Sequence, residues 1–328
     1  MTAPLFSIII PVFNKQKELP LCLRSLKVSE LPIEIILVDD GSTDELSAWT
    51  AEQIEQQVGT NSQLKLLRHS SNLGTYAARA TGIVAATGAY LVFLDADDTL
   101  APHALSTIAS KIDQHASDLL LTDWLYCDVT ATQSSRVSRS LPAAWSKEPT
   151  DALALYCKVT PLNLGIGGKV IKTAVAQKAV AAIGSLARPL TRFEDQLLVL
   201  VCATLADKAC YIPEPLYHYH HNPDSERDPA RVLNNYEQCL FALDRASSVG
   251  EELLPQGAIS TARYERLQHR LAQLAAINDY AIRNFPLARK SKGLSYLQAV
   301  WRGCQSKQSM KPWIALLLLL LSLGIVRK

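Results

Sequence analysis

The sequence lacks the cysteine patterns that hold small secreted or zinc-binding proteins together. Its seven cysteines are an odd number, and no two of them stand at the CxxC spacing. A disulfide framework needs cysteines in pairs, and structural zinc sites use closely spaced ones. We therefore expect neither, and we expect the protein to work in a reducing compartment.

Glycine-rich phosphate loops are also missing. Neither GxGxxG nor GxxxxGK[ST] occurs, which excludes the dinucleotide-binding and P-loop fingerprints. The apolar run Leu5–Phe13 has no basic segment before it and is broken by Pro11, so we expect no secretory signal peptide. Any nucleotide site in this chain must be built by another arrangement.

Acidic residues are absent from residues 280–328, which contain nine lysines and arginines. Residues 1–279 hold the other 24 basic residues and all 31 acidic ones. The net charge of +2 therefore combines an acidic body with a basic tail. Such asymmetry indicates a polyanionic partner, either a nucleic acid or an anionic membrane surface.

The end of the tail favours the membrane. Residues 314–326 read IALLLLLLSLGIV, between Trp313 and the final Arg327-Lys328. A helix over 312–326 would be about 22 Å long, short of the hydrocarbon core of about 30 Å. We predict a segment that dips into the cytoplasmic side of the inner membrane, with a buried core helix as the alternative. We expect no nucleic-acid binding, because no aromatic residues alternate with the basic ones.

The 328 residues are 48% apolar and 20% charged, as in a globular protein. Apolar, β-branched runs alternate with helical spacing, which favours an α/β fold with a mostly parallel sheet flanked by helices. The expected strands are Leu5–Val12, Glu34–Val38, Leu64–Arg68 and Tyr90–Leu94, and the expected helices are Lys15–Lys27, Thr75–Ala86 (ended by Gly88) and Thr261–Asn284. Ligands bind such sheets at the carboxyl ends of the strands.

Acidic clusters follow two of these strands. Asp95-Ala96-Asp97-Asp98 comes after Tyr90–Leu94, and three carboxylates so close together indicate a cation such as Mg²⁺ or Mn²⁺. The turn Asp39-Asp40-Gly41-Ser42-Thr43-Asp44 offers acceptors to a nucleotide or caps the next helix. A third cluster, Arg192-Phe193-Glu194-Asp195, is typical of a helix start. Taken singly, each cluster is also compatible with an ordinary capped turn or acidic loop.

Taken together, ordered blocks resemble the family 2 glycosyltransferases, which have the GT-A fold. The blocks are SIIIPVFNKQKELPLCLRSL (7–26), EIILVDDGSTDE (34–45), NLGTYAARATGIVAATGAYLVFLDADD (72–98), GGKVIKT (167–173), RFEDQLL (192–198) and EPLYHYHHNPDS (214–225). The resemblance covers roughly residues 5–225. It implies a Rossmann-like nucleotide-diphospho-sugar transferase domain over residues 1–225. We expect a helical, basic region over 226–311 and the membrane-associating segment over 312–328.

The resemblance also implies roles for individual residues. Those expected to bind the nucleotide sugar are Pro11, Phe13, Asn14, Asp40, Arg79, Asp95 and His220. Asp40 is expected at the base, and Asp97 with Asp95 at a Mn²⁺ or Mg²⁺ cofactor. Asp195, beside Glu194, is expected to be the catalytic base.

Four positions depart from the family pattern. Phe13 stands in place of a tyrosine, Ala80 follows Arg79 in place of an asparagine, and Gly168 precedes Lys169 in place of an asparagine or tryptophan. His220 follows Tyr219 where an arginine is usual. These departures bear on base and sugar selectivity and leave the expected metal and base positions intact.

The implied function is a metal-dependent, inverting glycosyltransferase that uses a nucleoside-diphosphate sugar, with UDP-sugar as the expected donor. The acceptor would be a lipid-linked or cell-surface glycan, or a glycolipid, at an anionic membrane surface. The alternatives are a polyprenyl-phosphate glycosyltransferase and a non-catalytic membrane adaptor that binds sugar nucleotides. A nucleotidyltransferase is disfavoured, because the turn after Leu5–Val12 has no Gly-rich, Arg-containing loop.

Overall fold

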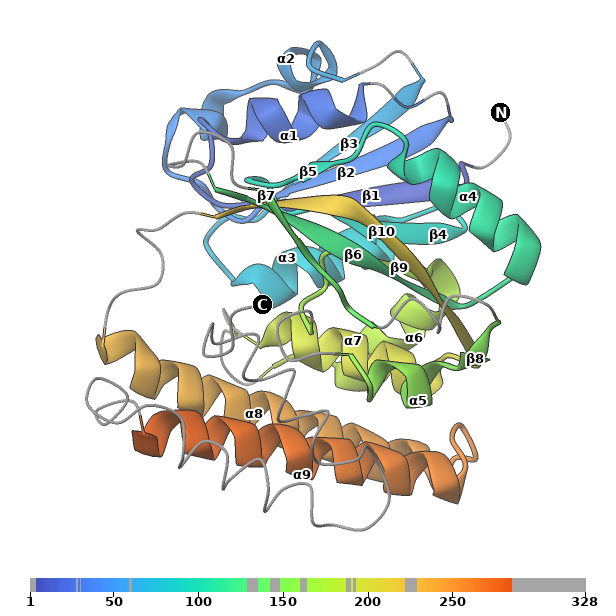
Figure 1. Ribbon diagram of the computed structural model, residues 1–328. Helices are drawn as coiled ribbons and strands as arrows, with labels where there is room; N and C mark the ends of the chain where they lie inside the picture. Colours follow the sequence, from blue (N-terminus) through green and yellow to red (C-terminus); the bar gives the residue numbers. More distant parts are fainter. Residues whose placement is uncertain are drawn as a thin grey trace.

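The computed structural model describes residues 4–27, 29, 31–58, 61–128, 135–141, 148–159, 164–186, 190, 193–221 and 229–284 (Figure 1). The strands are β1 (Phe6–Val12), β2 (Ile33–Asp39), β3 (Ser62–Arg68), β4 (Tyr90–Phe93), β5 (Thr99–Leu100), β6 (Leu119–Asp128), β7 (Ser135–Ser138), β8 (Thr150–Asp151), β9 (Lys169–Lys172) and β10 (Lys208–His221). The helices are α1 (Leu19–Leu26), the short 3₁₀ helix η1 (Glu45–Ala48), α2 (Ala51–Glu55), α3 (Thr75–Ala85), α4 (Ala104–His115), α5 (Ala152–Tyr156), α6 (Thr173–Ile183), α7 (Glu194–Leu205), α8 (Pro229–Leu253) and α9 (Thr261–Asn284).

The strands form one mixed sheet with the order β3-β2-β1-β4-β9-β6-β10-β5, to which β7 and β8 add at β6 and β10. Neighbours among β3, β2, β1 and β4 are parallel, as are β6 and β10. The short β9 runs antiparallel to both β4 and β6, so β4 and β6 point in the same direction. The carboxyl ends of β1, β2, β3, β4, β6 and β10 therefore share one edge, on the left in Figure 1.

Helices cover both faces of the sheet, as expected for strands that are apolar throughout. In β1, Ile8 and Ile10 pack in the core cluster that includes α1 and α4, and Ile9 packs in the cluster that includes α3, α6 and α7. Helices α8 and α9 form a further layer below α5, α6 and α7 (Figure 1). The prediction of a mostly parallel sheet flanked by helices is confirmed.

Two details differ from the sequence prediction. Helix α1 begins at Leu19 rather than Lys15, with Pro20 in its first turn, where a missing N–H costs nothing. Gly88 does not cap α3, whose C-cap is Ala86 in extended conformation. A methyl group at Gly88 would lie 2.6 Å from the backbone nitrogen of Ser7, so this glycine is required by the close approach of β1.

The helical region after residue 228 packs on the sheet-bearing part of the chain. Ala246 of α8 and Leu267 of α9 lie in the same buried cluster as Leu198 of α7. The division near residue 225 stays a prediction, since 222–228 and the boundary expected near Pro286 lie outside the described residues. The apolar tail 312–328 lies outside them too. No helix within the described part of the chain is long and apolar enough to cross a membrane.

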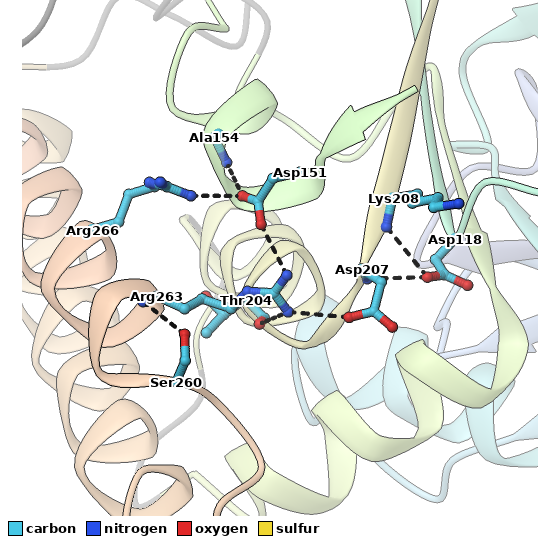
Figure 2. A network of polar contacts seen from close by, with 9 residues as sticks. All are labelled: Asp118, Asp151, Ala154, Thr204, Asp207, Lys208, Ser260, Arg263 and Arg266. Carbon is cyan, nitrogen blue, oxygen red and sulfur yellow. Dashed lines mark hydrogen bonds and ion pairs between the residues drawn. The ribbon is translucent and has the colours of Figure 1, made fainter. Parts of the chain in front are cut away.

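Arg263 of α9 fastens this outer layer to the body (Figure 2). Its guanidinium donates to Asp151, the N-cap of α5, at 2.9 Å and to the Thr204 carbonyl at the end of α7 at 3.3 Å. Asp207 lies 3.5 Å from the same group. Arg266 also reaches Asp151, at 2.8 Å, but its side chain is more exposed, 42% against 16% for Arg263.

We expect Arg263→Ala to lower the free energy of unfolding by about 1–3 kcal/mol, because it leaves part-buried acceptors without their charged donor. Arg266→Ala is the matched control, and it should cost less than about 1 kcal/mol, as exposed ion pairs do. Urea unfolding of both variants makes the comparison. Equal losses in the two variants would contradict a special role of Arg263 in docking α9.

Candidate functional site

The segments after β1 and β2 are held together by Asn14. This residue has φ +52°, in the left-handed region that asparagine tolerates. Its Oδ1 accepts from the backbone nitrogens of Thr43 and Asp44 at 2.8 and 3.2 Å, and its own nitrogen donates to Ser42 Oγ at 3.0 Å. Beside it Phe13 is 42% exposed. Asn14 thus shapes the turn of residues 39–44 after β2, while Phe13 is exposed.

Asp40 organises the loop that leads into α3. Its carboxylate accepts from the backbone nitrogens of Leu73 and Gly74, both at 2.9 Å, and Oδ1 lies 2.6 Å from Nδ1 of His69. Gly41, at φ +72°, would clash with the Ser71 backbone if it carried a side chain. A contact between Asp40 and the nucleotide base stays a prediction. The nucleotide base would have to share a buried carboxylate that already has these protein partners.

The three carboxylates after β4 have different surroundings. Asp95 accepts from Arg79 at 2.7 Å, and Asp97 accepts from the Lys15 ammonium, also at 2.7 Å. Asp98 is buried, and it accepts from the Tyr217 hydroxyl and from the backbone nitrogen of His220. Burial, with the charge of Asp95 added, raises the pKa of Asp98.

The contacts of these carboxylates bear on the expected metal site. No cluster of three or more metal-binding side chains occurs in the described residues. One or two carboxylates are the usual protein share of a Mg²⁺ site, with phosphate oxygens of the substrate completing it. Asp97 is one-third exposed and would supply that share in competition with the Lys15 ammonium 2.7 Å away, and Asp95 is close in sequence. The residues present therefore suit a metal that arrives with a diphosphate.

Arg79 joins the strand-end carboxylates to the start of α7. One guanidinium nitrogen donates to Asp95 and another to Glu194, both at 2.7 Å, and the side chain is almost fully buried. Burial opposes its charge, but the two carboxylates outweigh this effect and raise the pKa of Arg79. Burial, together with the charge of Asp195, raises the pKa of Glu194. Arg79 Nε and Glu194 Oε2 have no hydrogen-bond partner among the described residues.

Asp195 stands beside Glu194 in the first turn of α7, as the sequence predicts. Its Oδ1 accepts from the backbone nitrogen of Gln196 at 2.7 Å, and the residue is half-buried. A methyl group at Gly165 would lie 2.9 Å from Asp195 Oδ2. A side chain at position 165 would therefore require the Asp195 carboxylate to move. Arg192, the first residue of the same motif, lies outside the described residues.

Lys169 belongs to the GGK block of the sequence, and the structure buries it completely near these groups. Its ammonium donates to the Gly167 carbonyl at 3.3 Å and lies 5.2 Å from the Trp124 ring centroid. Burial lowers the pKa of Lys169 to about 7, although Asp195 opposes the shift. The sequence predicts no role for this residue, and a lysine inside an apolar strand was the available signal.

The other predicted residues lie at the same edge. Pro11 is the last residue but one of β1, and it is half-buried. His220 lies on β10, where its Nε2 is 3.0 Å from Thr99 Oγ1, and burial lowers its pKa against the opposing charge of Asp97. The structure thus gathers the predicted residues along one edge of the sheet, and it adds Lys15 and Lys169 to them.

Comparisons with known proteins agree with the sequence resemblance. Residues 7–172 of the chain match the family model of glycosyl transferase family 2. An uncharacterized glycosyltransferase of Haemophilus influenzae is 35% identical over 141 residues, which are 43% of this chain and 55% of that protein. A PGL/p-HBAD biosynthesis glycosyltransferase of Mycobacterium bovis is 39% identical over 127 residues, 38% of this chain and 48% of that protein. The chain spans about half the length of these curated relatives.

Solved structures share the fold. The Staphylococcus aureus TarS fragment 1–349 in complex with UDP-GlcNAc has a TM-score of 0.61 at 20% identity, covering 92% of this chain and 80% of that one. The mannosyltransferase PcManGT of Pyrobaculum calidifontis, in complex with GDP-Man and Mn²⁺, has a TM-score of 0.53 at 14% identity, covering 100% and 82%. The GT-A fold implied by the sequence is confirmed.

Lys169 gives a pH test of this arrangement. Its pKa is about 7 in the folded protein and about 10.4 in an unfolded chain. Between these values the unfolded chain binds a proton that the folded protein does not, so the contribution of Lys169 to stability rises with pH. Lys169→Met keeps the bulk of the side chain and removes this slope.

Urea unfolding of both proteins between about pH 7 and pH 10 measures the difference. The difference in unfolding free energy, native protein minus variant, should increase as pH rises. A difference that does not change with pH would contradict a buried, mostly neutral Lys169.

Proposed function

The chain belongs to glycosyl transferase family 2, and from this premise we propose that it transfers a sugar from a UDP-sugar to a hydroxyl group of a lipid-linked or surface glycan, with inversion at the anomeric carbon. The observation that carries the proposal is the Arg79 bridge. It joins Asp95, on the donor side, to Glu194, the neighbour of Asp195. The donor carboxylates and the candidate base are therefore two sides of one site.

The donor side has to bind a diphosphate that becomes a leaving group. Mn²⁺ or Mg²⁺ held by Asp97 and Asp95 would stabilise the negative charge that develops on that group. Lys15 supplies a second positive charge at the same carboxylate, 2.7 Å from Asp97. Asp98, held by Tyr217 and His220, keeps the turn in place.

The acceptor side needs a base, because a sugar hydroxyl is a weak nucleophile until its proton is removed. Asp195 is the candidate, and it is half-buried and held by a single backbone nitrogen within the described residues. Its neighbour Glu194 is anchored by Arg79, so the first turn of α7 is fixed. One base opposite the leaving group supports inversion rather than a covalent intermediate.

Two similar proteins support the choice of donor. TarS was solved with UDP-GlcNAc, and its name describes a poly(ribitol-phosphate) β-N-acetylglucosaminyltransferase. PcManGT was solved with GDP-Man and Mn²⁺. The first favours UDP as the nucleotide of this chain, and the second favours Mn²⁺ as its metal.

The tail supports work at a membrane. Nine basic residues and no acidic ones occur over 280–328, and the apolar run 314–326 is flanked by Trp313 and Arg327. Such a segment binds the interface through apolar area and through attraction to anionic lipids. We place the protein at the cytoplasmic side of the inner membrane, where a lipid-linked acceptor is presented.

Calorimetric titration with UDP, GDP and dTDP, each with Mn²⁺ and with EDTA, tests the donor site. We expect UDP to bind with Mn²⁺ present, and at least about tenfold more weakly in EDTA or in Asp97→Ala, because the metal links carboxylate and diphosphate. Asp113→Ala, at an exposed position on α4, is the matched control and should bind UDP as the native protein does. Metal-independent binding, or no binding of any of the three nucleotides, would refute the proposed donor site.

Removal of residues 312–328 tests the membrane segment. The full chain should sediment with vesicles that contain anionic lipid and bind neutral vesicles less, and the truncated chain should stay in the supernatant. Sedimentation of the truncated chain to the same extent would show that another surface holds the membrane.

A further inference from the structure

The three carboxylates after β4 are already engaged within the protein. Arg79 donates to Asp95 at 2.7 Å, and the Lys15 ammonium lies 2.7 Å from Asp97 Oδ2. Asp98 is buried and accepts hydrogen bonds from β10. A metal ion that binds at this turn must therefore compete with a protein cation for one of the two more exposed carboxylates.

The two protein cations differ in how firmly they are held. The Arg79 side chain is almost fully buried between two carboxylates, each at 2.7 Å. The side chains of Lys15 and Asp97 are 30% and 33% exposed, and Glu18 lies 3.9 Å from the same ammonium. Partly exposed ion pairs contribute little to stability, and the four-carbon stem of lysine is flexible. Lys15 can therefore change partner at small cost, whereas Arg79 cannot.

The backbone at Lys15 is anchored on both sides. The preceding residue, Asn14, accepts from the backbone nitrogens of Thr43 and Asp44. The Lys15 carbonyl accepts from the nitrogen of Leu19 at the start of α1, at 2.9 Å. The ammonium therefore moves on its own stem about a fixed Cα, and its reach stays centred on the turn after β4.

Asp97 cannot serve Lys15 and a metal ion equally well. A divalent cation at this carboxylate would lie close to the ammonium that now contacts it, and two cations at one carboxylate repel each other. The diphosphate of a nucleotide brings negative oxygens to the same place, and these can accept hydrogen bonds from the ammonium that Asp97 releases. The charge balance therefore favours metal and diphosphate together over the metal alone.

We propose that Lys15 is a donor-binding residue that exchanges partners: it pairs with Asp97 while no donor is bound, and it pairs with the diphosphate once Asp97 ligates the metal. Lys15 is then a competitor of the metal alone and a ligand of the diphosphate. This exchange couples the two binding events, so that each strengthens the other. The inference rests on the proposed function, since it concerns the donor side of the same site.

Electron paramagnetic resonance of free Mn²⁺ measures metal binding to the full-length protein without requiring turnover. Lys15→Met should bind Mn²⁺ alone about threefold to tenfold more tightly than the native protein does, because the competing ammonium is gone. The gain should disappear in the double variant Lys15→Met/Asp97→Ala, since Asp97 rather than Glu18 supplies the oxygen that is gained. Unchanged, weaker or undetectable binding of Mn²⁺ by Lys15→Met would overturn the proposal.

The same titrations with UDP, and separately with inorganic pyrophosphate, measure the coupling after correction for the Mn²⁺ that each diphosphate binds in solution. In the native protein, saturating diphosphate should raise the affinity for Mn²⁺ at least about tenfold. In Lys15→Met this factor should be at least about threefold smaller, because a competitor of the metal and a contact to the phosphate are lost together. Equal factors in the two proteins would overturn the proposal.

Lys17→Met is the matched control, because Lys17 is an exposed lysine of the same loop. It should bind Mn²⁺ and UDP as the native protein does, and an equal loss of coupling in this variant would overturn a specific role of Lys15. Lys15→Arg keeps the positive charge and should retain most of the coupling, which a role of Lys15 in packing alone would not predict. Lys15→Gln takes the place of the Met variant if that variant does not fold.

The two diphosphate probes separate this inference from the proposed function. If coupling that depends on Lys15 occurred with pyrophosphate while no nucleoside diphosphate bound, the role of Lys15 would stand and the donor proposal would fail. Metal-dependent binding of UDP with the same coupling in Lys15→Met as in the native protein would overturn the role of Lys15 and leave the donor proposal standing.

Discussion

A buried guanidinium between two carboxylates sets the geometry of the site. Arg79 reaches Asp95 and Glu194 at 2.7 Å each, inside the protein. A charge in that position is costly unless its partners stay in place, and removal of one partner of a buried pair typically costs about 3–5 kcal/mol. Helix α3, the end of β4 and the start of α7 are therefore fixed relative to one another by one side chain.

The chemistry of the site follows from that constraint. Asp97 lies two residues after Asp95 and faces Lys15, and Asp195 follows Glu194 directly. Under the proposed function, the donor carboxylate Asp97 and the base Asp195 would both be held in place by near neighbours that belong to a single ion-pair network. Gly165 completes the arrangement, because any side chain there would meet the Asp195 carboxylate. Preorganisation of this kind lowers the cost of orienting the reacting groups.

The sequence was enough to find the edge of the sheet and the acidic clusters on it, because apolar strands followed by Asp-rich turns are a local pattern. It was not enough to find their partners. Asn14 was expected to border the nucleotide, and its side chain holds the Thr43 and Asp44 nitrogens. The Lys169–Trp124 contact was missed, because it depends on the antiparallel insertion of β9 beside β6, a pairing between distant segments. Local pattern predicts where chemistry lies, and long-range pairing decides which groups meet.

The most direct test of the account is to compare sugar transfer and nucleotide binding in Asp195→Asn. The substitution keeps the shape of the side chain and removes its capacity to accept the acceptor proton, so transfer should fall by about 10²–10⁴-fold. UDP affinity should stay close to that of the native protein, since the donor carboxylates and the Arg79 bridge are untouched. Undiminished transfer in this variant would contradict the role of Asp195, and it would point to an acceptor that is already ionised, such as a lipid phosphate.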